Sequence, residues 1–237
     1  MVRTRATIVR SIRETLHDQG YLEVETPILQ LVHGGAAARP FRTHLNAFDI
    51  PMTLRIAIEL YLKRAIVGGV DRVYEMGRIF RNEGIDSSHS AEFTMLEAYQ
   101  SWGDQFTIAT MTRDLIVNAA DALGVESVDT PAGEVQLTGD WAWVSVYPGL
   151  SEALGEEITP DTSVERLRTI ADARGVEYDP AWIDQKLVLE LFGEIVEPTL
   201  VQPTFVNGYP AIAQPLARNN PDDPRLVEAW DLIIAGV

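Results

Sequence analysis

The chain has 237 residues, of which 46% are hydrophobic and 23% are charged, so a disordered or low-complexity polypeptide is excluded. The absence of cysteine excludes disulfide frameworks, thiol nucleophiles and cysteine-ligated zinc or iron–sulfur sites. The formal net charge of −16 argues against a module that binds nucleic acid through its bulk charge, although a local basic patch is still allowed.

The first half of the chain is expected to form helices and a strand hairpin. Ile8, Ile12 and Leu16 are spaced four residues apart, as on one face of a helix that Gly20 would end. The expected helices cover residues 4–19, 57–67 and 105–123, the last between Asp104 and Gly124; the expected strands cover 21–24, 72–81 and 92–100, and 33–38 form a loop of small residues.

The second half of the chain is less regular. Residues 125–160 alternate short apolar pieces with turn signals and yield no assignment. Helices are expected over 163–174 and 181–196, strands over 204–206, 211–213 and 227–234, and a loop over 219–224. Because neither a repeat nor a linker interrupts the pattern, we expect one α+β domain over 1–237. The last apolar segment is typical of a core strand, so a further segment is expected to follow it in the complete protein.

Neither a signal peptide nor a membrane span is expected. The first residues are basic, but no apolar core follows them, and no apolar run reaches the ~20 residues that a membrane helix needs. A cytoplasmic location is therefore expected.

The hairpin expected over 72–100 carries the strongest chemical signal. Because side chains alternate between the faces of a strand, Arg81, Glu83, Phe93, Glu97 and Tyr99 would share one face. A planar cation, an aromatic ring and several carboxylates suit a ligand with an anionic part, a flat ring and an amine. Singly, Arg81 and Glu83 could form a structural ion pair, Phe93 could belong to the core and His89 could be a solvated surface residue, so the prediction depends on the combination.

Several segments, in this order, resemble class II lysyl-tRNA synthetases. Residues 80–84, His89 and 92–97 resemble motif 2 of that family, and 22–27 resemble motif 1, whose proline lies at the dimer interface. Further resemblances cover 34–41, 54–64, 203–205, 215–217 and 220–224. Asn82 favours the lysine branch, because the related aspartyl and asparaginyl enzymes usually have an acidic residue there. The resemblance implies a class II antiparallel sheet flanked by helices, C-terminally incomplete, and a homodimer formed near Pro27.

The resemblance also implies that the site joins lysine to ATP in the presence of Mg²⁺, giving lysyl-adenylate and pyrophosphate. Arg81 would bridge the lysine carboxylate and the α-phosphate, because a bidentate guanidinium suits both anions. The residues implied for ATP are Arg81, Glu83 at the adenine amino group, Phe93 under the adenine ring and His89 at the outer phosphates.

For lysine, the resemblance implies Gly35, Glu59, Arg81, Glu97 and Tyr99. The carbonyl group of Gly35 and the carboxylate of Glu59 would take the α-ammonium group, while Glu97 and Tyr99 would line the pocket for the side-chain amine. Asp231 stands at a Mg²⁺ position that is usually glutamate, and the shorter aspartate would coordinate the metal through water.

The chain departs from the family pattern at several places. Ile58 stands where proline is usual, residues 90–91 replace Asn-Pro, and Gln214 replaces a serine. The family also has a second metal-binding glutamate, an Asn and a Ser-Glu that hold lysine, motif 3 and an N-terminal OB-fold that reads the anticodon. These 237 residues contain none of them, so this chain alone is expected to make little lysyl-adenylate.

The resemblance leaves three acceptors of the activated lysine open. They are tRNA(Lys) for translation, tRNA(Lys) for the synthesis of lysyl-phosphatidylglycerol, and a protein such as elongation factor P. Outside enzymes, the alternative is a degenerate paralogue that binds a partner, ATP or lysine without turnover.

Overall fold

The computed structural model describes residues 1–86 and 89–237 and contains two compact units. The hairpin unit is Arg13–Gly103, and the C-terminal unit combines Met1–Ile12 with Asp104–Val237. Helix α1 (Val2–Asp18) contributes to both units, and Gly20 follows it at a φ of 80°, as expected for a residue that ends a helix. That residues 1–237 act as one catalytic domain stays a prediction.

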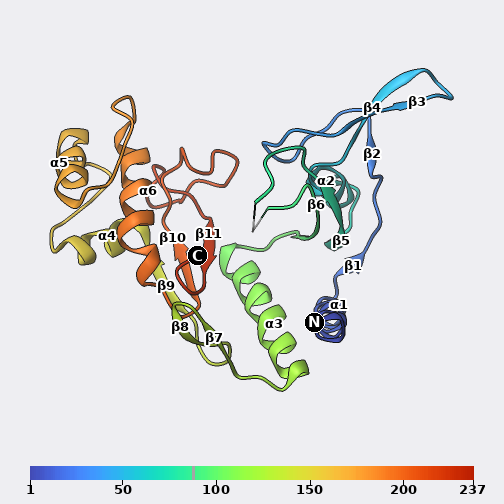
Figure 1. Ribbon diagram of the computed structural model, residues 1–237, viewed down its shortest axis with the longest axis horizontal. Helices are drawn as coiled ribbons and strands as arrows, with labels where there is room; N and C mark the ends of the chain where they lie inside the picture. The colour runs from blue at the N-terminus through green and yellow to red at the C-terminus, as the bar shows by residue number, and fades with distance from the viewer. Residues whose placement is uncertain (87–88) are drawn as a thin grey trace. The chain divides into compact units, whose positions relative to one another are not determined.

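Three strands form the main sheet of the hairpin unit, in the order β1-β5-β6 (Figure 1). β5 (Arg72–Phe80) and β6 (Glu92–Gln100) run antiparallel along their whole length, and β1 (Leu22–Glu23) adds to β5 in parallel. The prediction that 72–81 and 92–100 are neighbouring antiparallel strands is therefore confirmed.

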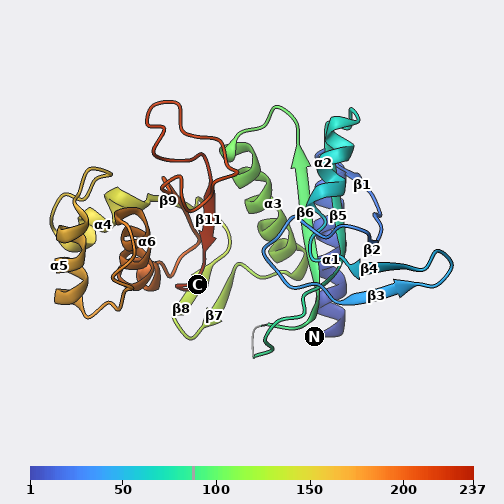
Figure 2. The same cartoon turned by 90° about the horizontal axis from the view of Figure 1, so that it is seen from above.

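A second small sheet precedes α2 (Glu59–Val67), and the sequence analysis did not predict it. Its strands are β2 (Leu29–Gln30), β3 (Arg42–Leu45) and β4 (Ile50–Leu54), in the order β2-β4-β3. Figure 2 shows β3 and β4 projecting from the hairpin unit. These strands are short and largely exposed, so the sequence does not show the alternation of apolar and polar residues that indicates a strand.

One face of the β5–β6 hairpin packs against α2. The residues in this contact include Ile58, Leu62, Val73, Ile79, Phe93, Met95 and Tyr99. On the same strand, Glu97 accepts a hydrogen bond from the Ile58 N–H group, at 2.9 Å. Phe93, Glu97 and Tyr99 therefore share a face, as the alternation of side chains predicted.

Arg81 and Glu83 lie beyond the strand on which they were expected, because β5 ends one residue before Arg81. The Arg81 N–H group still donates to the Ala91 carbonyl group, at 2.9 Å, but the Asn82 N–H group donates to the carbonyl group of Arg39, at 2.8 Å. The chain leaves the sheet at this point. The two-residue alternation therefore does not decide where the Glu83 side chain lies.

The C-terminal unit contains a three-stranded sheet of order β11-β10-β9 (Figure 1). β9 (Ala142–Ser145) and β10 (Thr204–Asn207) are parallel, and β11 (Trp230–Ile233) is antiparallel to β10. The other elements are α3 (Gln105–Leu123), β7 (Ser127–Thr130), β8 (Gly133–Gln136), α4 (Val146–Leu154), α5 (Val164–Arg174), α6 (Asp184–Ile195) and a short 3₁₀ helix, Glu197–Thr199. The helices predicted over 105–123, 163–174 and 181–196 are confirmed.

Helices α4, α5 and α6 form the largest buried cluster of this unit, to which Leu150, Leu167, Leu187 and Phe192 contribute. In the described part of the chain, no helix is both long enough and apolar enough to cross a membrane.

Two strands expected near the C-terminus differ from the structure. Residues 211–213 form turns, in which the Ala213 N–H group donates to the Pro210 carbonyl group at 2.9 Å. Pro210 and Pro215 flank this segment and cannot donate to a strand ladder, which leaves too short a run for a strand. The strand expected over 227–234 is limited to β11.

Removal of the Asp104 cap is expected to destabilise the C-terminal unit. The Asp104 carboxylate accepts from the Thr107 N–H group and from its hydroxyl, each at 2.7 Å, within a capping box at the start of α3. The hydrogen bonds from the side chain and backbone of Thr107 lower the pKa of Asp104 from its usual 3.8. The stabilisation is therefore fully present above pH 3.8 and is lost as the pH falls through the lower pKa of the folded state.

Urea unfolding of Asp104→Ala should give a lower midpoint than wild type at neutral pH. The difference should narrow when the pH falls below 3.8. Equal midpoints at neutral pH would contradict the role of this cap.

Candidate functional site

A cavity of about 320 Å³ lies where β5 ends and β6 begins. Its lining residues are Arg81, Glu83, Gly84, His89, Ser90 and Phe93. The lining includes all the residues predicted to bind ATP. They come together because the antiparallel pairing of β5 and β6 brings the end of one strand next to the start of the other.

The Arg81 guanidinium group is held by a ring and by the backbone. Its Cζ atom lies 5.3 Å from the centroid of the Phe93 ring, within the range of a cation–π contact. Its Nε atom donates to the carbonyl group of Ile56, at 3.2 Å. Phe93 also packs against the buried cluster under α2, so it belongs both to the core and to the wall of the cavity.

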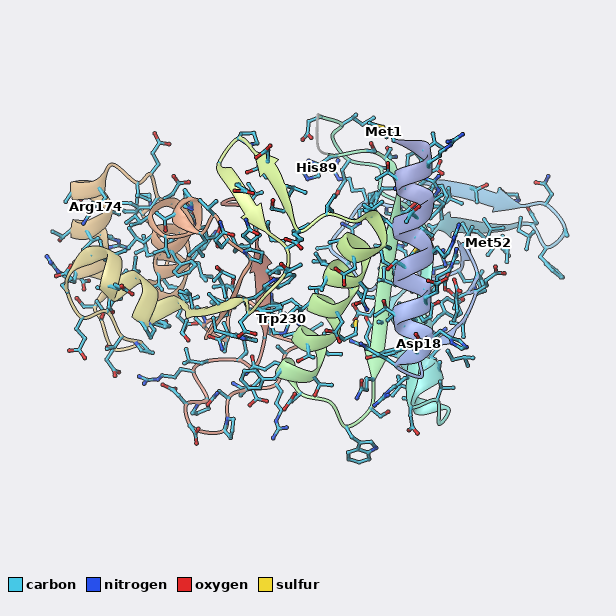
Figure 3. All side chains as sticks on the ribbon, turned by 90° about the horizontal axis from the view of Figure 1, so that it is seen from below. Met1, Asp18, Met52, His89, Arg174 and Trp230 are labelled. Atoms are coloured by element: carbon cyan, nitrogen blue, oxygen red, sulfur yellow. The ribbon has the colours of Figure 1, made fainter. Side chains whose placement is uncertain are left out.

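His89 is held by Asp86, a residue that the sequence analysis did not single out. The His89 Nδ1 atom lies 2.8 Å from Asp86 Oδ2, and the His89 N–H group donates to Asp86 Oδ1 at 2.8 Å. The His89 side chain is 73% exposed and is labelled in Figure 3. An aspartate three residues before a histidine in a polar, Gly- and Ser-containing segment was the signal that could have identified this pair.

A second group of acidic side chains lies at the start of α2. Glu97 Oε1 accepts from the Ile58 N–H group at 2.9 Å, and Glu97 Oε2 accepts from the Tyr99 hydroxyl at 3.1 Å. Ile58 has no capping side chain of its own, so Glu97 satisfies the first N–H group of the helix. A proline at this position would have no N–H group to donate, so the departure from the family pattern creates this hydrogen bond.

The Tyr99 hydroxyl stays protonated beside these carboxylates. Burial, and then the negative charges of Glu97 and Glu59, raise the pKa of Tyr99. Tyr99 therefore acts as a hydrogen-bond donor over the whole physiological pH range.

Gly35 lies against the first turn of α2. Its φ is 88°, and a Cβ atom there would lie 3.0 Å from the Cβ atom of Glu59 and 3.1 Å from that of Ala57. Both the backbone conformation and the close approach therefore require glycine. Glu59 Oε1 in turn accepts from the Lys63 Nζ atom, at 2.7 Å. The structure thus brings Gly35 and Glu59 together, as the sequence analysis expected.

Residues 56–59 connect the cavity with the acidic group. The Ile56 carbonyl group holds Arg81, the Ile58 N–H group holds Glu97, and Glu59 follows directly. One short segment therefore links the wall of the cavity to the carboxylates of Glu59 and Glu97, which are not among the residues that line the cavity. This arrangement can receive a ligand with an anionic part, a flat ring and an amine.

A buried ion pair anchors the same segment, and the sequence analysis missed it. The Arg55 Nη1 atom lies 2.5 Å from Glu75 Oε1, and the two side chains are 3% and 5% exposed. Arg55 Nε donates to the Arg78 carbonyl group at 2.8 Å, while Glu75 Oε2 accepts from the N–H group and the hydroxyl of Thr26, at 3.0 and 2.6 Å. A Cβ atom on Gly77 would collide with the guanidinium group. The signal was a pair of opposite charges on apolar segments, since each needs a buried partner.

Asp231 lies in the C-terminal unit, on β11. Burial, and then the charge and the hydrogen bond of Asp231, raise the pKa of Tyr209, and burial followed by the same charge raises the pKa of Glu197. Within the described residues there is no group of three or more His, Cys, Asp or Glu that could hold a metal. Mg²⁺ commonly takes only one or two carboxylates together with water and phosphates, so an aspartate with oxygen-bearing neighbours fits this ion.

Comparisons with known proteins identify the family. The sequence profile of tRNA synthetases class II (D, K and N) matches residues 1–237. The chain is 51% identical over 245 residues to lysine–tRNA ligase 1 of Mycobacterium tuberculosis. The aligned region covers 100% of this chain and 48% of the ligase. It is also 51% identical over 238 residues to the lysine–tRNA ligase of Kineococcus radiotolerans, covering 99% of this chain and 48% of that protein.

A relative with a different name is the lysylphosphatidylglycerol biosynthesis bifunctional protein LysX of Mycobacterium marinum. The identity is 48% over 243 residues, which are 100% of this chain and 22% of LysX. The chain therefore spans about half the length of the lysine–tRNA ligases it matches and a smaller share of LysX. Because the family profile covers every residue of the sequence, the chain belongs to the class II tRNA synthetases of the D, K and N group.

Proposed function

We propose that the protein activates lysine with ATP to form lysyl-adenylate and then transfers the lysyl group to tRNA(Lys). The observation that carries this proposal is the segment 56–59, which joins the cavity around Arg81 and Phe93 to the carboxylates of Glu59 and Glu97. The 51% identity to lysine–tRNA ligases supports the choice of lysine.

In the first step, an oxygen of the lysine carboxylate attacks the α-phosphorus of ATP. A carboxyl–phosphate bond forms, the bond from the α-phosphorus to the bridging oxygen breaks, and pyrophosphate leaves. Both reactants are anions and no proton is transferred, so catalysis depends on charge neutralisation and positioning. Arg81 supplies a guanidinium group that can bind the carboxylate and the α-phosphate together. Its contacts with Ile56 and Phe93 hold it for that role.

The remaining residues of the cavity would bind the rest of ATP. Phe93 would pack against the adenine ring, Glu83 would accept from the adenine amino group, and His89 would contact the outer phosphates. Mg²⁺, when bound, would neutralise phosphate charge. Asp231 would hold the ion, through water because its side chain is short.

Lysine would be recognised through its two ammonium groups. Glu59 and the Gly35 carbonyl group would take the α-ammonium group, and Glu97 with Tyr99 would take the amine of the side chain. The Tyr99 hydroxyl already donates to Glu97, which fixes the carboxylate before the ligand arrives.

The acceptor is tested with the complete gene product, labelled lysine, ATP and Mg²⁺. We expect the label on tRNA(Lys) and not on elongation factor P. Label on elongation factor P alone would favour a protein ligase, and label that passes from tRNA(Lys) to phosphatidylglycerol vesicles would favour the lipid route. Absence of label on every acceptor, with lysine and ATP still bound, would favour a non-catalytic paralogue.

The expected location of the protein is the cytoplasm.

A homodimer is expected to form through the segment near Pro27. Apolar side chains around it are exposed in the single chain, among them Leu31 at 67% and Val32 at 78%. Exposed apolar residues that follow one another along a chain favour a protein interface. Sedimentation at micromolar concentration should give a dimer that Leu31→Glu converts to monomer. A wild-type monomer at these concentrations would contradict the prediction.

A further inference from the structure

An ammonium group already lies at the carboxylate that is proposed to receive the α-ammonium group of lysine. The Lys63 Nζ atom is 2.7 Å from Glu59 Oε1 and 6.0 Å from the centroid of the Tyr99 ring. Lys63 and Glu59 lie one helical turn apart on α2, whereas Tyr99 lies on β6. The Lys63 ammonium group therefore contacts side chains from two elements, and both side chains belong to the proposed lysine site.

The two partners of this ion pair differ in burial. The Glu59 side chain is 24% exposed, and the Lys63 side chain is 51% exposed. The carboxylate is thus the more buried partner, while the ammonium group sits on a long side chain that can move into water. An exposed pair at this spacing is weak, so a ligand can displace it.

The positive charge of Lys63 also disfavours the binding of a lysine ligand. A lysine ligand brings two ammonium groups to Glu59 and Glu97, and the positive charge of Lys63 opposes both. The α-ammonium group must in addition replace the Lys63 hydrogen bond to Glu59.

We infer that Lys63 competes with the α-ammonium group of the substrate for Glu59 and thereby sets the affinity of the site for lysine. This inference rests on the proposed function, because it requires Glu59 to bind that group. If the pair only stabilised α2, its removal would not change the binding of lysine.

The test is the dissociation constant of lysine, measured by calorimetry on the complete gene product. Lys63→Met keeps the length of the side chain and removes its charge, and it should tighten lysine binding by about two- to fivefold, the range expected for a weak exposed ion pair. Lys63→Arg keeps the charge and should bind lysine as the wild type does.

A matched control is available in the same chain. Lys186 is the other lysine of these residues and lies in α6, with its Nζ atom 4.2 Å from the centroid of the Trp182 ring. Lys186→Met removes the same charge from a cation–π contact in the C-terminal unit and should leave lysine binding unchanged.

A second ligand separates competition at Glu59 from a general effect of charge. The compound 6-aminohexanoate is lysine without the α-amino group, so it should gain less affinity from Lys63→Met than lysine does. Equal gains for both ligands, or unchanged or weaker binding of lysine to Lys63→Met, would overturn the inference. A wild-type protein that binds no lysine would instead overturn the proposed function and this inference with it.

Discussion

Glu75→Gln is expected to lower the free energy of unfolding by about 3–5 kcal/mol, the typical cost of leaving a buried charge without its partner. The Arg55 guanidinium group would remain among buried groups, where its side chain is 3% exposed, and would lose the carboxylate at 2.5 Å. Thr26 would lose a charged acceptor for its N–H group and hydroxyl. Urea unfolding followed by circular dichroism measures the change.

The double variant Arg55→Met/Glu75→Leu serves as the control for this prediction. Because it removes both charges together, it should be clearly more stable than either single variant. Additive losses in the double variant, or a loss below about 1 kcal/mol in Glu75→Gln, would indicate that the pair is not desolvated as the structure has it.

Arg81→Ala is expected to reduce the rate of lysine-dependent ATP–pyrophosphate exchange by at least about 10²-fold, the loss typical of one preorganised electrostatic contact to a transition state. Arg81→Lys should also be strongly impaired, because an ammonium group cannot reproduce a bidentate fork. Arg81 is partly exposed, so its removal should lower the unfolding midpoint much less than Glu75→Gln does.

Steady-state exchange at saturating lysine, measured over a range of ATP concentrations, separates the effect on chemistry from that on binding. A loss confined to the KM of ATP, with kcat unchanged, would assign Arg81 to ground-state binding alone. Exchange within a few-fold of wild type would remove Arg81 from the catalytic machinery.

The elements that the sequence predicted well are those with a strong local pattern. Two runs rich in apolar and aromatic residues, separated by a polar stretch with glycine and serine, indicated the β5–β6 hairpin, and α3 carries an aspartate cap and a glycine stop. The shared face of Phe93, Glu97 and Tyr99 follows from the two-residue alternation of side chains along a strand. Arg81 and Glu83 fall outside this reasoning, because the chain leaves the sheet after Phe80.

The features that the sequence analysis missed depend on contacts between distant segments. Arg55, Glu75 and Thr26 are far apart in the chain, and only the fold brings them together. The small sheet of β2, β3 and β4 also depends on pairing rather than on local pattern. The hydrogen bond from Ile58 to Glu97 arises because a residue other than proline stands at the start of α2.

These missed contacts hold parts of the predicted site in place. The Arg55–Glu75 pair anchors the chain directly before Ile56, whose carbonyl group holds Arg81. The stability of the hairpin unit and the geometry of the site are therefore linked through one segment. A partial loss of exchange in Glu75→Gln at temperatures where it is still folded would agree with this link.

Lysine-dependent ATP–pyrophosphate exchange by the complete gene product tests the central claim most directly. Exchange should require lysine and Mg²⁺, and neither aspartate nor asparagine should replace lysine. Absence of lysine-dependent exchange in the complete protein, or a preference for aspartate or asparagine, would contradict the assignment of Arg81, Glu59 and Glu97 to lysine activation.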